Sequence, residues 1–297
     1  MNDDGSGITQ LTDNSAYNTS PYWSPDGTKI LFVFSKEGSN DRIVDLYLMN
    51  DDGSALTRLT NGPAYNLLPN WSPDGTKIAF QSILAGNQEI HVMKADGSGE
   101  SNLSLNPAVD TLPFWSPDGT EILFTSRRGL NDEIYVMSAD GSQQTNLTNN
   151  PATENAFDPW SPDGKKIAFT SDREGNNDIF VMDADGSGMI NLTDNPHSDW
   201  FPKWSPDGRQ IAFLSDRDGS VDIYVMNADG NRVIRLTNSP GDKTYLEWSP
   251  DGTRIAFAYD WEGNGPHDIF VVNVDGSGLT NLTNSPGDDS APDWSLR

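Results

Sequence analysis

Trp-Ser-Pro-Asp-Gly occupies residues 23–27 of this 297-residue chain and returns five more times. The other complete copies begin at Trp71, Trp115, Trp160, Trp204 and Trp248, and a broken copy begins at Trp294. Successive copies lie 44 to 48 residues apart, as the residue numbers show. This period is typical of a four-stranded propeller blade and is longer than a repeat of two helices needs. The repeat therefore predicts an all-β chain folded as a β-propeller.

Two turn motifs alternate within each repeat. In Ser-Pro-Asp-Gly, the fixed φ of proline starts a tight turn, and glycine accepts the positive φ at its end. Asp-Gly follows later, for example at Asp52-Gly53 and Asp140-Gly141, as expected of a two-residue hairpin. The apolar runs between the turns lack clean alternation, which indicates strands that are covered on both faces. We therefore expect blades of four antiparallel strands.

Six complete blades and some surplus chain are expected within one propeller domain, residues 1–297. The approximate blade intervals are 23–60, 71–104, 115–148, 160–193, 204–237 and 248–283. Residues 4–12 copy the end of a blade, and residues 291–295 copy the beginning of one. Three arrangements of these surplus strands stay open: a partial seventh blade, redundant docking on a closed six-bladed ring, or a seven-bladed parent. We favour the six-bladed ring because six is the complete count.

Charge and composition exclude several classes of partner. The chain carries 44 acidic and 19 basic side chains, a net charge of −25, which repels nucleic acid and anionic membrane surfaces. The absence of cysteine excludes disulfides and thiolate metal centres. No run of about 18 apolar residues exists, so no membrane insertion is expected. The first residues have neither a basic nor an apolar region, so no signal peptide is visible.

The repeat resembles that of the TolB-type β-propellers, a WD-like family. The resemblance lies in Trp-Ser-Pro-Asp-Gly-x-Lys-Ile-Ala-Phe-x-Ser, then Asp-Ile-Tyr-Val-Met-x-Ala-Asp-Gly-Ser-Gly, then Asn-Leu-Thr, and it covers essentially the whole chain. The histidine of eukaryotic WD repeats has no counterpart, since His91, His197 and His267 do not share a repeat position. The resemblance implies six blades, a periplasmic or extracellular location and a role in protein interaction. Related blades also precede the hydrolase domain of prolyl oligopeptidase-like enzymes.

Binding is expected at the loops that differ between copies, because such loops are free of the requirements of the fold. Exposed aromatic rings among polar groups mark interfaces. The candidate docking residues of this kind are Tyr17, Tyr65, Phe157, Trp200, Tyr245 and Trp261. The alternative is that several of these rings pack between blades. The expected partner is another protein or a peptide, and the chain is expected to be a monomer unless the spare strands join copies.

A polar residue stands five positions before each repeat tryptophan. The series is Asn18, Asn66, Asp110, Asn155, Asp199, Lys243 and Asp289. In a ring these side chains converge at the mouth of the central channel, and Asn18, Asn66, Asp110, Asn155 and Asp199 join the candidate binding residues. Because Ca²⁺ prefers carboxylate and carbonyl oxygens, Asp110, Asp199 and Asp289 are candidate metal ligands. No other cofactor is expected.

A second acidic series opens the third strands. It consists of Asp45, Glu89, Glu133, Asp178, Asp222 and Asp268. Arg127, Arg173 and Arg217 recur nearby, and we expect them to pair with these acids rather than leave them free for a ligand.

Catalysis is not expected. The chain has no Gly-x-Ser-x-Gly motif, and its three scattered histidines form neither a metal triad nor a Ser-His-Asp site. The predicted function is that of a non-catalytic scaffold for protein–protein interaction through the variable loops and the channel mouth. The alternative is a propeller that binds a divalent cation or a carbohydrate, and hydrolase or lyase chemistry is the third choice.

Overall fold

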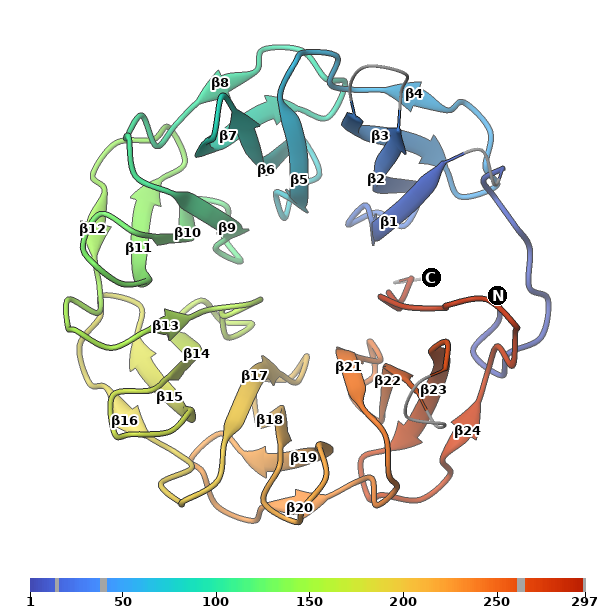
Figure 1. Ribbon diagram of the computed structural model, residues 1–297, viewed down its shortest axis with the longest axis vertical. Coiled ribbons are helices and arrows are strands. Elements are labelled where there is room, and N and C mark those ends of the chain that lie inside the picture. Colours follow the sequence, from blue (N-terminus) through green and yellow to red (C-terminus); the bar gives the residue numbers. More distant parts are fainter. Residues whose placement is uncertain (14–15, 38–41, 261–264, 296–297) are drawn as a thin grey trace. The chain divides into compact units, whose positions relative to one another are not determined.

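The computed structural model describes residues 1–13, 16–37, 42–260 and 265–295. Over these ranges it contains strands β1 to β24, no helix, and therefore no helix that is long and apolar enough to cross a membrane. The strands form six separate four-stranded antiparallel sheets (Figure 1). The predicted all-β fold, a propeller with six complete blades of four strands, is confirmed. We number the blades one to six in chain order.

Each of the first three blades follows the chain order from its first to its fourth strand. The bounds are β1 Tyr17–Trp23, β2 Lys29–Glu37, β3 Arg42–Asn50, β4 Thr57–Arg58; β5 Tyr65–Trp71, β6 Lys77–Leu84, β7 Asn87–Lys94, β8 Ser101–Asn102; β9 Asp110–Trp115, β10 Glu121–Ser126, β11 Glu133–Ser138, β12 Thr145–Asn146.

The last three blades repeat this order. The bounds are β13 Glu154–Asn155, β14 Lys166–Ser171, β15 Asp178–Asp183, β16 Ile190–Asn191; β17 Asp199–Trp204, β18 Gln210–Ser215, β19 Asp222–Asn227, β20 Ile234–Arg235; β21 Lys243–Trp248, β22 Arg254–Tyr259, β23 Asp268–Asn273, β24 Thr280–Asn281.

In most blades the first strand ends at the repeat tryptophan, as in β5, which runs from Tyr65 to Trp71. The predicted intervals, which begin at the tryptophan, therefore omit most of this strand. The segments expected to be variable loops ahead of the tryptophan lie largely inside it. The fourth strands are only two residues long.

Hydrogen bonds explain why Ser-Pro-Asp-Gly reverses the chain between first and second strands. In blade one the Ser24 hydroxyl donates to Asp26 Oδ1 at 2.7 Å, and the Thr28 amide donates to the same oxygen at 3.0 Å. Gly27 closes the turn with φ 64° and donates its amide to the Ser24 carbonyl at 2.8 Å. A left-handed residue is required at this point, which is where glycine has no steric cost.

The chain divides into two compact units, each described by itself. The N-terminal unit comprises Gln10–Asn155 with Ser295, and the C-terminal unit comprises Met1–Thr9 with Ala156–Trp294. In the C-terminal unit, the repeat tryptophans join consecutive blades. Trp204 Nε1 donates to the Pro159 carbonyl at 3.1 Å, and Trp248 Nε1 donates to the Lys203 carbonyl at 3.0 Å. Both tryptophans are buried, so they pack between blades as expected.

The terminal segments form no strand within the described residues, yet in the C-terminal unit they contact blade six as a further blade would. Trp294 Nε1 donates to the Glu247 carbonyl at 3.3 Å, which repeats the bond made by Trp248. Arg254 Nη2 donates to Asp3 Oδ2 at 2.8 Å. Gly5 lies so near blade six that a Cβ on it would be 2.8 Å from the Leu282 carbonyl oxygen. The surplus chain therefore docks through side chains and turns rather than through strand pairing.

Candidate functional site

A left-handed residue lies within the first strand of five blades and, in blade four, between β13 and the isolated bridge at Trp160. Its φ lies between 48° and 56°. In blades one to six, in that order, the residue is Ser20, Leu68, Leu112, Asp158, Phe201 and Tyr245. The strand register shifts around it wherever both partner strands are long, for example between Thr244 and Glu247. Non-glycine residues adopt this conformation at a cost of about 1 kcal/mol or more. A bulge of this kind bends the strand and turns a side chain in a new direction.

Three of the six candidate aromatic residues are exposed. In the N-terminal unit the exposed fractions of Tyr17 and Tyr65 are 75% and 39%, and in the C-terminal unit that of Tyr245 is 57%. Trp200 is half-buried against the core between blades five and six. Phe157 is also half-buried, and Trp261 lies outside the described residues.

Phe201 is an exposed aromatic residue that sequence reasoning missed. It occupies the bulge of β17, its exposed fraction is 51%, and its ring centroid lies 6.4 Å from that of Phe157 in an edge-on contact. Phe201 and Tyr245 hold the same bulge position in consecutive blades of the C-terminal unit. The left-handed φ carried no signal in the sequence, because neither residue is glycine or asparagine.

A charged cluster lies two residues further along the same strands. Lys203 Nζ forms ion pairs with Glu247 and, at 3.0 Å, with Asp158 Oδ2. The exposed fraction of the side chain is 15% for Lys203 and 25% for Glu247. Burial is the main cause that raises the pKa of Glu247 to about 7; the carboxylates of Asp158 and Asp293 also raise it, and Lys203 opposes the change. The two nearby carboxylates raise the pKa of Lys203, although burial opposes this, so the lysine stays charged.

The polar series five positions before the tryptophan is mostly buried. Asn66, Asp110, Asp199 and Lys243 are buried, and Asn18 is half-buried. Arg128 Nη2 donates to Asp110 Oδ2 at 3.0 Å, and burial raises the pKa of Asp110 although Ser126 and Arg128 act to lower it. Asp110 is held within its own blade, whereas Lys243 of blade six pairs with Asp222 of blade five.

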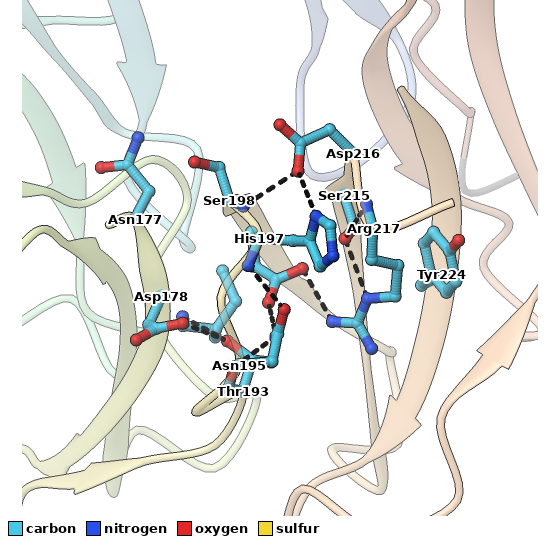
Figure 2. A network of polar contacts seen from close by, with 12 residues as sticks. Asn177, Asp178, Thr193, Asn195, His197, Ser198, Ser215, Asp216, Arg217 and Tyr224 are labelled. Atoms are coloured by element: carbon cyan, nitrogen blue, oxygen red, sulfur yellow. Dashed lines mark hydrogen bonds and ion pairs between the residues drawn. The ribbon is translucent and has the colours of Figure 1, made fainter. Parts of the chain in front are cut away.

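Figure 2 shows this arrangement in blade five. The figure labels Arg217, Ser215, Tyr224 and Asn195. The Asp199 carboxylate accepts bonds from Arg217 Nη2 at 2.7 Å and from Asn195 Nδ2 at 2.7 Å. Arg217 Nε donates to Ser215 Oγ at 2.9 Å, and its guanidinium carbon lies 4.9 Å from the centroid of the Tyr224 ring. Asp199 is thus bonded both to its own blade and to the segment that precedes it.

Blade four differs from the expected register. Asn155 is exposed, and the buried acid at the start of this first strand is Glu154, whose Oε1 accepts from Asn150 Nδ2 at 2.7 Å. The same i−4 bond joins Asn195 to Asp199 and Ser285 to Asp289. Blade four has one more residue between this position and its tryptophan, so counting back from Trp160 selected the wrong neighbour.

The acids that open the third strands bind the hydroxyl that follows the fourth strand of their own blade. In blade five, Thr237 Oγ1 donates to Asp222 Oδ1 at 2.8 Å and accepts from the Ile223 amide at 3.0 Å. The expected pairing with the nearby arginines is wrong in two cases, because Arg127 pairs with Asp132 and Arg217 with Asp199. Arg173 donates to Ser171 Oγ at 2.9 Å.

The three candidate calcium ligands form hydrogen bonds with different groups. Asp110 and Asp199 each pair with an arginine, and Asp289 accepts from Ser285 Oγ at 2.8 Å. Over the described ranges, no three His, Cys, Asp or Glu side chains gather in a group that could hold a metal ion. Calcium binding by these three residues stays a prediction.

Two cavities occur in the N-terminal unit. One, of about 450 Å³, has Asp26, Lys29, Trp71, Asp74 and Asp96 among its lining, so it lies at the turns that recur in every blade rather than at the segments that differ between blades. The other, of about 350 Å³, belongs to blade two and contains His91 and Glu100. Neither was predicted from the sequence, because each depends on side chains from several strands.

The family model of the TolB β-propeller domain matches residues 1–82, 61–158 and 144–247. The chain belongs to the TolB β-propeller domain family. Among curated proteins, none matches this chain significantly.

Solved structures with this propeller fold include two TolB proteins. A putative TolB from Agrobacterium tumefaciens is 25% identical with a TM-score of 0.63, over 76% of this chain and 83% of that one. TolB from Acinetobacter baumannii is 24% identical with a TM-score of 0.71, over 91% of this chain and 67% of that one. An oligogalacturonate lyase in complex with manganese is 18% identical with a TM-score of 0.71, over 88% of this chain and 75% of that one, a likeness in fold alone.

Proposed function

We propose that this TolB-family propeller is a non-catalytic module that binds another protein or a peptide through the first strands of its blades. The observation that carries the proposal is the exposure of Phe201 and Tyr245, at 51% and 57%, on equivalent bulges of consecutive blades. Aromatic side chains are enriched among the central residues of protein interfaces. The Lys203–Glu247 ion pair lies two residues further along the same strands.

The hydrogen bonds of the buried carboxylates support a binding role rather than a catalytic one. Asp222 accepts from Thr237 of its own blade, and Asp199 and Glu154 accept from Asn195 and Asn150 in the segments that precede their strands. The role of these acids in the fold is therefore to hold strands and connecting segments together. Family membership further supports a location outside the cytoplasm, in the periplasm or the extracellular space.

Lyase or peptidase chemistry is the competing function, since propellers of similar fold occur in such enzymes. The test is to incubate the purified chain with oligogalacturonates, with manganese or calcium added, and with proline-containing peptides. We expect no turnover above a buffer control with any of these substrates. Turnover that scales with protein concentration would overturn the non-catalytic assignment.

A further inference from the structure

Blade two contains a cavity of about 350 Å³. Six of the residues that line it, drawn from β6 to β8 and the segments beside them, are Ser82, Leu84, Glu89, His91, Glu100 and Asn102. None of them belongs to the candidate binding surface described above.

Three other blades hold an arginine at the position that Leu84 occupies in this blade. Arg128, Arg173 and Arg217 each stand 13 residues after the tryptophan of their repeat, as Leu84 does after Trp71. Their guanidinium carbons lie 4.8 to 4.9 Å from an aromatic ring of the third strand and 5.3 to 5.7 Å from a phenylalanine of the second. Guanidinium groups are attracted to aromatic faces at such distances.

Blade two retains a ring pair like those beside these arginines, in which Phe80 is fully buried and His91 lines the cavity. The ring centroids of Phe80 and His91 are 5.6 Å apart, compared with 5.6 to 5.8 Å for the ring pairs beneath the three arginines. Ser82 stands 11 residues after its tryptophan, as do Ser171 and Ser215, which accept from the arginine Nε at 2.9 Å. Leu84 is uncharged and its exposed fraction is 54%. The ring pair is thus present in blade two, and Leu84 stands where the other three blades have an arginine.

The charges around the cavity favour a cation. Glu89 is buried, and the donors that reach it in the described chain are neutral: the Asn87 amide group, the Ser104 hydroxyl and the Asn106 backbone amide. The corresponding acid of blade five, Asp222, pairs instead with Arg235 and Lys243.

Blade two lacks both of those cations. Asn102 takes the place of Arg235, opposite His91 on the neighbouring strand. Glu100 adds a second carboxylate, whose Oε1 lies 2.9 Å from His91 Nδ1. No lysine or arginine is among the described residues that line the cavity.

We propose that the blade-two cavity binds a guanidinium group supplied from outside the chain, in the place where Arg128, Arg173 and Arg217 seat their own. The group stacks on the His91 ring and donates to Glu89 and Glu100, which suits its planar set of donors. Arg128 and Arg217 donate instead to the first-strand acids Asp110 and Asp199 of their blades. The proposal is independent of the protein-binding role of the first strands. An arginine side chain of a polypeptide and a free small guanidinium compound share this chemistry.

Calorimetric titration with L-arginine amide tests the chemistry, with citrulline amide, whose side chain is uncharged, as the control of nearly the same shape. We expect saturable binding of arginine amide, and binding of citrulline amide weaker by about tenfold or more, because the side-chain charge is lost. Equal affinities, or no binding of arginine amide, would overturn the proposal.

Leu84→Arg tests the location, since it supplies the guanidinium from within the chain as the other three blades do. We expect this variant to lose binding of arginine amide and to melt at a higher temperature. Leu130→Arg adds the same charge at a fully exposed leucine of blade three and is expected to bind as the wild type does. Undiminished binding by Leu84→Arg would contradict the assignment.

A capped Gly-Arg-Gly peptide distinguishes the two sources of the group. Binding at least as tight as that of arginine amide supports a polypeptide partner, whereas binding of arginine amide alone supports a small guanidinium compound. Failure of both ligands overturns the proposal.

Discussion

Lys203 and Glu247 stand immediately before the tryptophans of consecutive blades and form an ion pair that is largely withdrawn from solvent. The pKa of Glu247 is raised to about 7, chiefly by burial. A raised acid pKa means that the folded state binds the proton more tightly than the unfolded state. The contribution of Glu247 to stability is therefore complete below its ordinary pKa of 4.5 and is lost as the pH rises through about 7.

Glu247→Gln removes this titration. We compare the free energies of unfolding of the variant and the wild type. From pH 5 to pH 8 their difference is expected to shift in favour of the variant by on the order of 2 kcal/mol, because only the wild type loses the contribution of the protonated Glu247. Urea denaturation of both proteins at the two pH values measures the change. A stability difference that is the same at pH 5 and pH 8 would show that Glu247 does not titrate in this range.

Tyr245 is predicted to carry backbone strain, because it is a non-glycine residue with φ 56°. Tyr245→Val is expected to destabilise the protein by about 1–2 kcal/mol relative to Tyr245→Gly, because a β-branched residue is poorly tolerated at positive φ whereas glycine is not strained there. Thermal unfolding of the two variants measures this difference in stability. Valine at least as stable as glycine would argue against the left-handed bulge.

Lys243 is the buried cation of blade six, and its Nζ lies 3.0 Å from Asp222 Oδ1 and 4.9 Å from the centroid of the Tyr259 ring. Lys243→Met is expected to destabilise the fold by about 3 kcal/mol, because it leaves a buried carboxylate with fewer partners. Lys165→Met, at an exposed lysine of the same unit, is the matched control and should change stability by less than about 0.5 kcal/mol. Equal effects of the two substitutions, measured by urea denaturation, would contradict this role of Lys243.

Much of the fold follows from the repeat alone. The regular return of Trp-Ser-Pro-Asp-Gly and of Asp-Gly is enough to predict six four-stranded blades, because both motifs have a fixed turn chemistry. The exact position of a strand does not follow where a blade gains a residue. Between Glu154 and Trp160 one extra residue shifts the register, and Asn155 was named in place of Glu154.

Less of the candidate site could be predicted. The aromatic character of Tyr245 was visible, but the exposure of Phe201 depends on a positive φ that neither its side chain nor its neighbours signal. The Lys203–Glu247 pair joins residues 44 positions apart in different blades, so packing alone reveals it. Arg217 was expected to pair with a third-strand acid, yet its Ser215 contact and the Tyr224 ring orient it towards Asp199.

The bulge aromatics of the C-terminal unit, Phe201 and Tyr245, are predicted to bind a protein partner. Quantitative capture from an extract of the native host tests this on immobilised wild type, on the double variant Phe201→Ala/Tyr245→Ala, and on the control Ile190→Ala/Leu279→Ala. The control removes two exposed hydrophobic residues from the outer part of the same unit.

We predict at least one protein that the wild type and the control retain equally and that the double variant retains about tenfold less, as expected when central aromatic residues are truncated. If the double variant retains the same proteins in the same amounts as the wild type, the bulge aromatics are not the binding surface.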